Sequence, residues 1–303
     1  MKKHPQLAVQ GHRPKRVCLF GTSANPPTGA GGHAGVIQAL VDLRKFDEIR
    51  ILPVYRHTFV SKRHQLLGFD HRFKMCELLV KGLSITENKD DTTKVVVSRA
   101  EKDSFARMIN VSRAVTDEEK AVLRVGTADL LEMLMEDEER TQTRDKSISN
   151  TKLFKTEFSF CLGADTFIDL TDFKWKRSKD VLKLLGGRLV VVNRMQQQDD
   201  DTETVICTDI SSDAIHQQQK QKDLLRGRID KINATPLGDE NIMLLYVPSL
   251  GDVSSSQVRK ADNKELVQQM LSPEVLDYVI ANNLYGFGEK KKEVEEEEGS
   301  IIV

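Results

Sequence analysis

The sequence predicts an α/β protein in which a mostly parallel sheet carries helices on both faces. Short apolar runs alternate with amphipathic segments along most of the 303 residues. Several of these apolar runs are continuous, as in strands that are buried on both faces. A loop of small or polar residues follows most of them. This alternation is typical of a Rossmann-like, doubly wound fold, in which ligands bind at the carboxyl ends of the strands.

The chain is organised around its first strand, loop and helix. Residues 17–20 form an apolar run that ends at Gly21, and a loop of glycines and prolines leads to His33. Apolar residues at helical spacing within 36–43 then predict an amphipathic helix. A second strand at 48–54 completes a βαβ unit, whose crossover should be right-handed.

The middle of the chain combines a basic stretch with charged segments. The basic stretch at 55–80 runs into a helix and suits an anionic ligand, although a solvated positive surface explains it equally well. A third strand is expected at 94–98, followed by an inserted helical excursion at 99–123. The polar run at 136–150 has no aromatic residue, so we expect a mobile linker there.

The second half repeats the alternation of strands and helices. Residues 195–225 are rich in Gln, Asp and Lys, which predicts a second loose insertion. We divide the chain into a leader at 1–15, one domain at 16–286 and a charged tail at 287–303. The remaining strands are expected at 158–162, 188–193 and 242–247, and the remaining helices at 127–134, 181–185 and 266–285.

Composition limits the partners and the compartment. The net charge of −1 gives no general attraction to nucleic acid or to a membrane surface. No apolar run approaches the ~20 residues that a membrane helix needs. The four cysteines are far apart and form no CxxC pair, so we expect neither disulfides nor a zinc site. These features favour a cytoplasmic protein, with the nucleus and organelles left open, and they are compatible with a homo-oligomer.

The loop after the first strand is the first candidate binding site. Its glycines let backbone amides approach phosphate oxygens closely, and His33 at the helix start can donate a hydrogen bond to a phosphate. The alternative is a glycine-rich surface turn with an incidental histidine. No Gly-Lys-Ser/Thr follows, so this is not a P-loop. The residues that follow predicted strands and should converge with this loop are Asp165, Asn193 and Ser249.

Two motifs here resemble signatures of the nucleotidylyltransferase superfamily. The sequence GTSANPPTGAGGH, residues 21–33, resembles G-x-F-x-P-x-(H/T)-x-G-H, and VSSSQVR, residues 253–259, resembles I-S-S-T-x-x-R. The resemblance implies a Rossmann-like doubly wound sheet of nucleotidylyltransferase type. This chain departs from the pattern at several points. Ala24 replaces the phenylalanine, Thr22 the first glycine and Ser256 the threonine, and Gly29-Ala30-Gly31 enlarge the loop between Thr28 and Gly32-His33.

Four further stretches resemble nicotinamide or nicotinate mononucleotide adenylyltransferases. They are LGADTFIDLTDFKWK at 162–176, TADLL at 127–131, LSPEVLDYVIANNLYG at 271–286, and Lys62 with FDHRFKM at 69–75. The implied reaction transfers the adenylyl group of ATP to a pyridine mononucleotide and yields NAD or deamido-NAD and pyrophosphate. The partners would be ATP as co-substrate and the mononucleotide, with Mg²⁺ held mostly by substrate phosphates.

The resemblance and the residues' positions together give candidate roles. Asp165 has an alternative role as a helix cap, Trp175 as a core residue, and Arg194 as an ordinary surface arginine. The serines of the second motif have an alternative as a polar surface turn. The candidate catalytic residues are His33, Arg259, Lys62 and Thr28. The candidate nucleotide-binding residues are Gly21, Thr22, Ser23, Gly32, Gly163, Asp165, Trp175, Arg194, Ser254 and Ser255.

Two other functions fit the same motifs. One is a cytidylyltransferase or a pantetheine-phosphate adenylyltransferase on the same fold. The other is a nucleotide-binding protein that has lost catalysis through the enlarged loop. The sequence does not decide between the nicotinate and the nicotinamide substrate, because that choice depends on the shape of the pocket.

Overall fold

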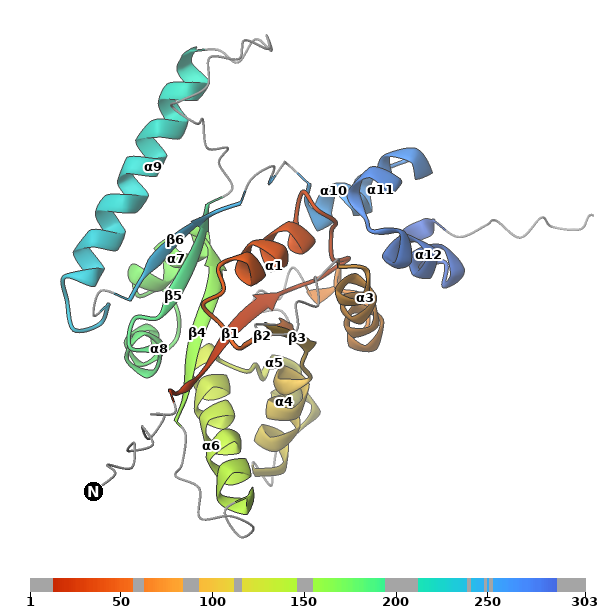
Figure 1. Ribbon diagram of the computed structural model, residues 1–303. Coiled ribbons are helices and arrows are strands. Elements are labelled where there is room, and N and C mark those ends of the chain that lie inside the picture. The colour runs from red at the N-terminus through yellow and green to blue at the C-terminus, as the bar shows by residue number, and fades with distance from the viewer. Residues whose placement is uncertain are drawn as a thin grey trace, which may run out of the picture.

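The sheet has six parallel strands in the order β3-β2-β1-β4-β5-β6 (Figure 1). The computed structural model describes residues 13–56, 63–83, 93–111, 116–145, 155–193, 212–238, 241–247, 250 and 253–287. The predicted doubly wound, parallel architecture is confirmed. The strand order reverses between β1 and β4, and in such sheets a ligand crevice opens where the order reverses. The strands are β1 (Lys15–Thr22), β2 (Glu48–Pro53), β3 (Lys94–Val97), β4 (Thr156–Gly163), β5 (Leu189–Asn193) and β6 (Met243–Tyr246).

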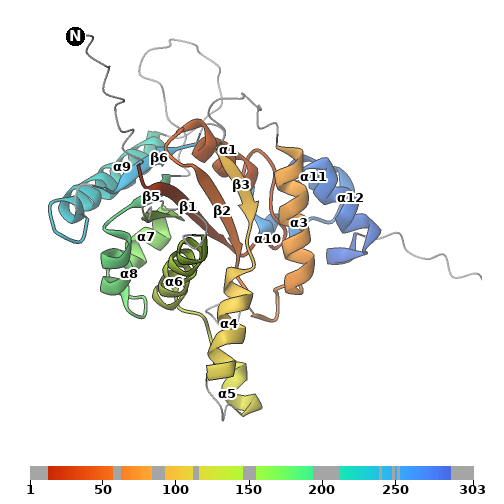
Figure 2. The same cartoon turned by 60° about the horizontal axis from the view of Figure 1, so that its bottom comes forward.

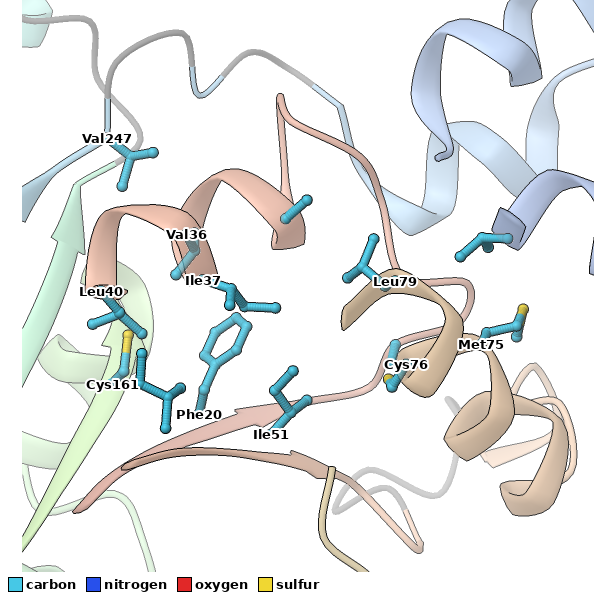
Figure 3. Packing of buried hydrophobic residues seen from close by; sticks show 14 of the residues in the cluster. Phe20, Val36, Ile37, Leu40, Ile51, Met75, Cys76, Leu79, Cys161 and Val247 are labelled. Atoms are coloured by element: carbon cyan, nitrogen blue, oxygen red, sulfur yellow. The ribbon is translucent and has the colours of Figure 1, made fainter. Parts of the chain in front are cut away.

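Helices on one face of the sheet enclose the first hydrophobic core. The side chains of Phe20 on β1, Ile37 on α1 and Cys76 on α3 meet in this core, as Figure 3 shows. The C-terminal helices join the same core, because Val258, Val267 and Val275 also belong to it. The helices on this side are α1 (His33–Asp42), α3 (Phe69–Gly82), α10 (Ser255–Lys260), α11 (Lys264–Met270) and α12 (Pro273–Ala281), followed by the short helix η1 (Leu284–Gly286).

A second core lies on the opposite face. Leu131 on α6, Phe167 on α7 and Leu182 on α8 are fully buried there against the sheet. The helices on this side are α6 (Thr127–Asp145), α7 (Ala164–Thr171), α8 (Ser178–Leu185) and α9 (Ser212–Asn233). The predicted helical excursion is present as α4 (Ala100–Val111) and α5 (Asp117–Val122), which extend away from the body in Figure 2.

The predicted linker at 136–150 is wrong over its first ten residues, because α6 continues to Asp145. Its charged side chains form ion pairs there: Asp137 with Arg107 of α4 (2.8 Å), and Glu136 with Arg140 one turn further on (3.2 Å). Such pairs on a helix surface stabilise the helix. Residues 146–150 lie outside the described part of the chain.

The predicted loose insertion at 195–225 is also corrected, because α9 begins at Ser212. Leu225 and Ile229 are buried in the second core, one helical turn apart, with Ile232 packed beside them. That apolar stripe fixes the C-terminal half of α9 against the domain, although its composition is polar. Residues 194–211 fall outside the described residues, as do 1–12 and the charged tail at 288–303.

The structure describes the end of the predicted leader, from Arg13 onward. The Arg13 guanidinium forms an ion pair with Asp47 (2.6 Å), and β1 begins at Lys15. Both Cys18 and Cys161 are buried thiols, as expected, and so is Cys76, where burial raises the pKa of the thiol to about 12. Over the described residues, no helix has the length and apolar character needed to cross a membrane.

Candidate active site

The loop between β1 and α1 lies at the carboxyl edge of the sheet, beside the point where the strand order reverses. Strand β1 ends at Thr22, and α1 begins at His33. Gly163 ends the neighbouring strand β4, whose pairing with β1 brings it to the same edge. The sheet therefore places the loop where α/β proteins bind nucleotides.

The imidazole of His33 is held by two threonines of this loop. The Thr28 backbone N–H donates to His33 Nδ1 (3.1 Å), and the Thr28 hydroxyl lies 2.7 Å from the same nitrogen. Nδ1 must therefore accept, which places the proton of the neutral ring on Nε2. Nε2 lies 2.8 Å from the Thr22 hydroxyl and donates to it. His33 is thus oriented with one N–H directed to the end of β1.

The longer segment Gly29-Ala30-Gly31, which has two residues more than the family pattern, leaves this contact intact. They form a turn in which the Gly32 N–H donates to the Gly29 carbonyl (2.9 Å). The Gly29 N–H in turn donates to the Met270 carbonyl at the end of α11 (2.8 Å). The enlargement therefore extends toward α11, while Thr28 and His33 stay in hydrogen-bond contact.

The serine–arginine segment docks directly onto this loop. The Ser255 hydroxyl donates to the Pro26 carbonyl (2.7 Å), and Arg259 Nη1 donates to the Asn25 carbonyl (2.5 Å). Ser254 caps α10 by accepting from the Gln257 N–H (3.3 Å). Segments more than 200 residues apart in the sequence thus meet at one edge of the sheet, and Arg259 of α10 contacts the loop that leads to His33.

For the other predicted site residues that the structure describes, we report their place in the fold. Asp165 is exposed in the first turn of α7, where Gly163 occupies the cap position. Trp175 is half-buried and packs against the second core. Asn193 ends β5 and is buried. Three of the predicted residues, Lys62, Arg194 and Ser249, lie outside the described part of the chain.

A pocket rich in arginine adjoins the loop and was not specified from the sequence. Its volume is about 420 Å³. Burial and the like charges of Arg124 and Arg56 lower the pKa of Arg63, as expected where cations crowd together. We call this site the arginine pocket, and its lining residues are Tyr55, Arg56, Arg63, Leu66, Leu67, Gly68, Phe69 and Arg72.

Arg72 joins the arginine pocket to the loop between β1 and α1 (residues 23–32), which we call the nucleotide loop after its predicted ligand. Its side chain is buried, with 1% of the residue exposed. The guanidinium donates to the carbonyls of Leu67 (2.8 Å) and Ser23 (2.9 Å), which are uncharged acceptors. Burial lowers its pKa, because a low dielectric disfavours the charged form. The sequence held a signal for this residue: Arg72 occupies the apolar stripe of α3, between Phe69 and Met75.

Glu101 of α4 is an acidic residue next to two residues that line this pocket, Tyr55 and Arg72. Its carboxylate accepts a hydrogen bond from the Tyr55 N–H (2.9 Å). Burial raises the pKa of Glu101 to about 7, against the opposing effects of that hydrogen bond and of the Arg72 charge. Near neutral pH the carboxyl is therefore only partly ionised, and the positive charge of Arg72 is only partly balanced.

Comparisons with known proteins agree with this architecture. No family model matches the chain. A curated protein of Acholeplasma laidlawii, named "Probable nicotinate-nucleotide adenylyltransferase", is 38% identical over 71 residues, which are 23% of this chain and 36% of that protein. The match thus spans about a third of the length of that relative. The solved structure of a Plasmodium falciparum nicotinic acid mononucleotide adenylyltransferase, complexed with NaAD, has a TM-score of 0.51 and 18% identity, and the match covers 91% of this chain and all of that one.

The fold is that of an α/β protein with a doubly wound parallel sheet, and the solved adenylyltransferase structure shares it. Both named proteins are mononucleotide adenylyltransferases, so the resemblance first stated from the sequence motifs is confirmed. The structural likeness concerns the fold, and the sequence match is partial.

Proposed function

We propose that the protein transfers the adenylyl group of ATP to a pyridine mononucleotide, with nicotinate mononucleotide as the preferred substrate. The observation that carries this proposal is the contact between two regions whose groups suit anions. The loop that holds His33 and the pocket that holds three arginines share Arg72, whose guanidinium reaches Ser23 of the loop. A reaction between two phosphorylated substrates requires two such regions side by side. The names of the two similar proteins support the same reading.

The ATP triphosphate would lie on the loop at the start of α1. Backbone N–H groups and the positive end of a helix favour anions there. The Nε2–H of His33, which donates to Thr22 in the structure, would turn to a phosphate oxygen. Arg259 now donates to an uncharged carbonyl, and a phosphate is a stronger acceptor for a guanidinium.

The mononucleotide would occupy the arginine pocket. Its phosphate is an anion, and Arg56, Arg63 and Arg72 supply positive charge around the cavity. Nicotinate carries one more negative charge than nicotinamide, so a pocket with this charge favours it. Tyr55 and Phe69 provide aromatic faces against which a flat ring can pack.

Magnesium would accompany the ATP. Mg²⁺ retains several waters and is bound through substrate phosphates with few protein ligands. The described residues contain no group of three or more His, Cys, Asp or Glu placed to hold a metal ion, so they form no cage of their own. The partly buried hydroxyl of Thr22, at the end of β1, would supply one oxygen ligand to an ion held mainly by phosphate oxygens and water. The bound ion would neutralise charge on the triphosphate.

The proposed reaction needs no covalent enzyme intermediate. A phosphate oxygen of the mononucleotide attacks the α-phosphorus of ATP, and the bond from that phosphorus to the β-phosphate oxygen breaks. The new bond completes the dinucleotide, and pyrophosphate leaves with the electron pair. The chain contributes by aligning the two substrates and by neutralising the negative charge that develops, through His33 and Arg259.

Pyrophosphate release tests the proposal. The full chain is incubated with ATP, Mg²⁺ and either nicotinate or nicotinamide mononucleotide, and parallel reactions contain CTP or pantetheine phosphate. We expect pyrophosphate with ATP and the two pyridine substrates, and a higher kcat/KM for nicotinate mononucleotide. Release only with CTP or with pantetheine phosphate would replace this function with its alternatives. ATP binding without turnover would indicate a catalytically silent protein.

A histidine pair provides the matched control. His33→Ala removes the donor proposed for the phosphate, and loss of one such donor lowers kcat by about 10²- to 10³-fold. His71 also bonds a hydroxyl, that of Tyr278 (2.9 Å), but it lies between α3 and α12. His71→Ala should therefore keep most of the activity. Equal losses in the two variants would contradict the role proposed for His33.

A further inference from the structure

Asn25 contacts three segments of the site, which are residues 65–67 beside the arginine pocket, α10 through Arg259, and η1. Its side chain is buried, with 3% of the residue exposed. The amide Nδ2 donates to the Gln65 carbonyl (2.7 Å), and Oδ1 accepts from the Leu67 N–H (3.1 Å). Leu67 lines the arginine pocket. The backbone carbonyl of Asn25 accepts from Arg259. Asn25 thus contacts the edge of the arginine pocket with its side chain and Arg259 with its backbone.

The third segment is η1, which reaches Asn25 through Tyr285. The Tyr285 hydroxyl donates to Asn25 Oδ1 (2.9 Å), across 260 positions of sequence. Burial raises the pKa of this phenol well above its usual range, so the hydroxyl stays protonated and remains a donor. The positive charges of Arg72 and Arg259 both oppose this rise, so the hydroxyl lies near an arginine of each region.

The backbone at Tyr285 is held in an unfavourable conformation. Its φ is +57°, in the left-handed region that favours glycine, and it lies between Asn283 at +49° and Gly286 at +83°. Asparagine and glycine tolerate this region, but a tyrosine there is uncommon. Conformations of this kind persist where the surrounding contacts determine them, and they cluster at functional sites. Here the surrounding contact is the hydrogen bond to the nucleotide loop.

We infer that Tyr285 is a positioning residue, which acts through Asn25 to hold the nucleotide loop and the edge of the arginine pocket in register. Without its hydroxyl, Asn25 Oδ1 keeps only the Leu67 N–H among the partners described above. The amide of Asn25 is then held by two hydrogen bonds in place of three, and its looser placement changes that of both Leu67 and the carbonyl that Arg259 binds. This inference depends on the proposed function only for the identity of the ligands.

The test compares two tyrosines on the same C-terminal segment. Tyr285→Phe removes the hydroxyl and keeps the ring. Tyr278→Phe is the matched control, because its hydroxyl bonds His71 of α3 and does not reach the nucleotide loop. Calorimetry with Mg²⁺-ATP and no second substrate should show ATP binding weakened by about five- to tenfold in Tyr285→Phe, the equivalent of one lost hydrogen bond. In Tyr278→Phe, ATP binding should stay within about twofold of the wild type.

Two further readouts separate positioning from simple stability. Hydrogen exchange should rise at the Leu67 amide and in residues 22–34 in Tyr285→Phe, and should stay unchanged there in Tyr278→Phe. Where turnover is measured, KM should rise for both substrates in Tyr285→Phe, with a smaller change in kcat. Wild-type ATP affinity and wild-type exchange in Tyr285→Phe would overturn the inference. So would failure of Tyr285→Phe to fold, since the hydroxyl would then be a general structural contact.

The proposed function and this inference can fail separately. A wild-type chain that makes no dinucleotide would remove the proposed function. The inference would still stand if Tyr285→Phe alone loosens the Leu67 amide and the loop. Conversely, an active wild-type enzyme whose Tyr285→Phe variant exchanges and binds ATP normally would keep the function and remove the positioning role.

Discussion

A methyl group added at Gly32 should disable the site through Thr28. A Cβ atom on Gly32 would lie 2.0 Å from the Thr28 hydroxyl oxygen and 2.9 Å from the Thr28 Cβ. Real contacts of a Cβ atom are essentially never shorter than 3.0 Å, so the hydroxyl must move by about 1 Å or more. Thr28 is β-branched and fully buried, which restricts the rotations open to it.

The cost of this movement follows from the contacts that Thr28 makes. Its hydroxyl lies 2.7 Å from the ring of His33 and accepts from the His33 N–H (3.1 Å). Overpacking of this kind costs about 1–3 kcal/mol, and each lost hydrogen bond adds about 1 kcal/mol. We therefore expect Gly32→Ala to lower the free energy of unfolding by roughly 2–4 kcal/mol. A displacement of His33 by 1 Å is enough to slow catalysis by about 10²-fold.

Urea unfolding and pyrophosphate release measure the two effects. Gly227 of α9 is the control, because a Cβ atom there meets nothing within 4 Å. Gly227→Ala should raise stability by up to about 1 kcal/mol, since alanine favours a helix, and should leave turnover unchanged. If Gly32→Ala retained wild-type stability and turnover, the packing of Thr28 against Gly32 would have no role in holding His33.

Three other changes test the surrounding structure. The pKa of Glu101 is about 7 when folded and near 4.5 otherwise, so the folded state holds its proton more tightly. The free energy of unfolding should therefore fall by about 3 kcal/mol as the pH rises from 4.5 through 7. Glu101→Gln should remove this fall, as measured by urea unfolding across the same pH range. Arg177→Ala should lower the melting temperature, because this guanidinium bonds Asp129 (2.8 Å) and Glu132 (2.5 Å) of α6, and the difference should shrink in about 1 M salt. Arg72→Lys keeps the positive charge, but an ammonium group does not reproduce the planar guanidinium that donates to two carbonyls. The KM for the mononucleotide should therefore rise, while the circular dichroism spectrum stays native. An unchanged KM there would exclude Arg72 from substrate binding.

The strands were predictable because their apolar runs are unbroken. The expected strand at 188–193 is fully buried from Leu189 to Asn193 in the centre of one half of the sheet, and the one at 94–98 was placed within a residue of β3. The errors fell in polar segments. Composition suggested a loose segment at 136–145, yet Asp137 has a partner on another helix, which no local pattern shows. In α9, the spacing of Leu225 and Ile229 was visible in the sequence but was outweighed by the surrounding glutamines.

The candidate site was predictable where a motif marks a residue and unpredictable where a residue acts through its neighbours. His33 and Arg259 stand in recognisable motifs, and the structure brings their segments together. Asn25 stands in the same motif at a position where any residue is allowed, so nothing in the pattern indicates that it binds Gln65 and Leu67. Arg72 could have been noticed, because a charged residue on the apolar stripe of a helix requires a buried partner.

The enlarged loop shows which property of the motif the fold preserves. The family pattern specifies one residue between the threonine or histidine position and the Gly-His pair, and this chain has three in its place. The structure nevertheless keeps the Thr28 hydroxyl 2.7 Å from His33, because the longer segment forms a turn whose Gly29 N–H bonds the Met270 carbonyl at the end of α11. Gly32 makes the close return possible, since any side chain there would displace Thr28. The hydrogen bond is thus maintained by a contact with a helix some 240 residues further along the chain, so α11 belongs to the architecture that orients His33.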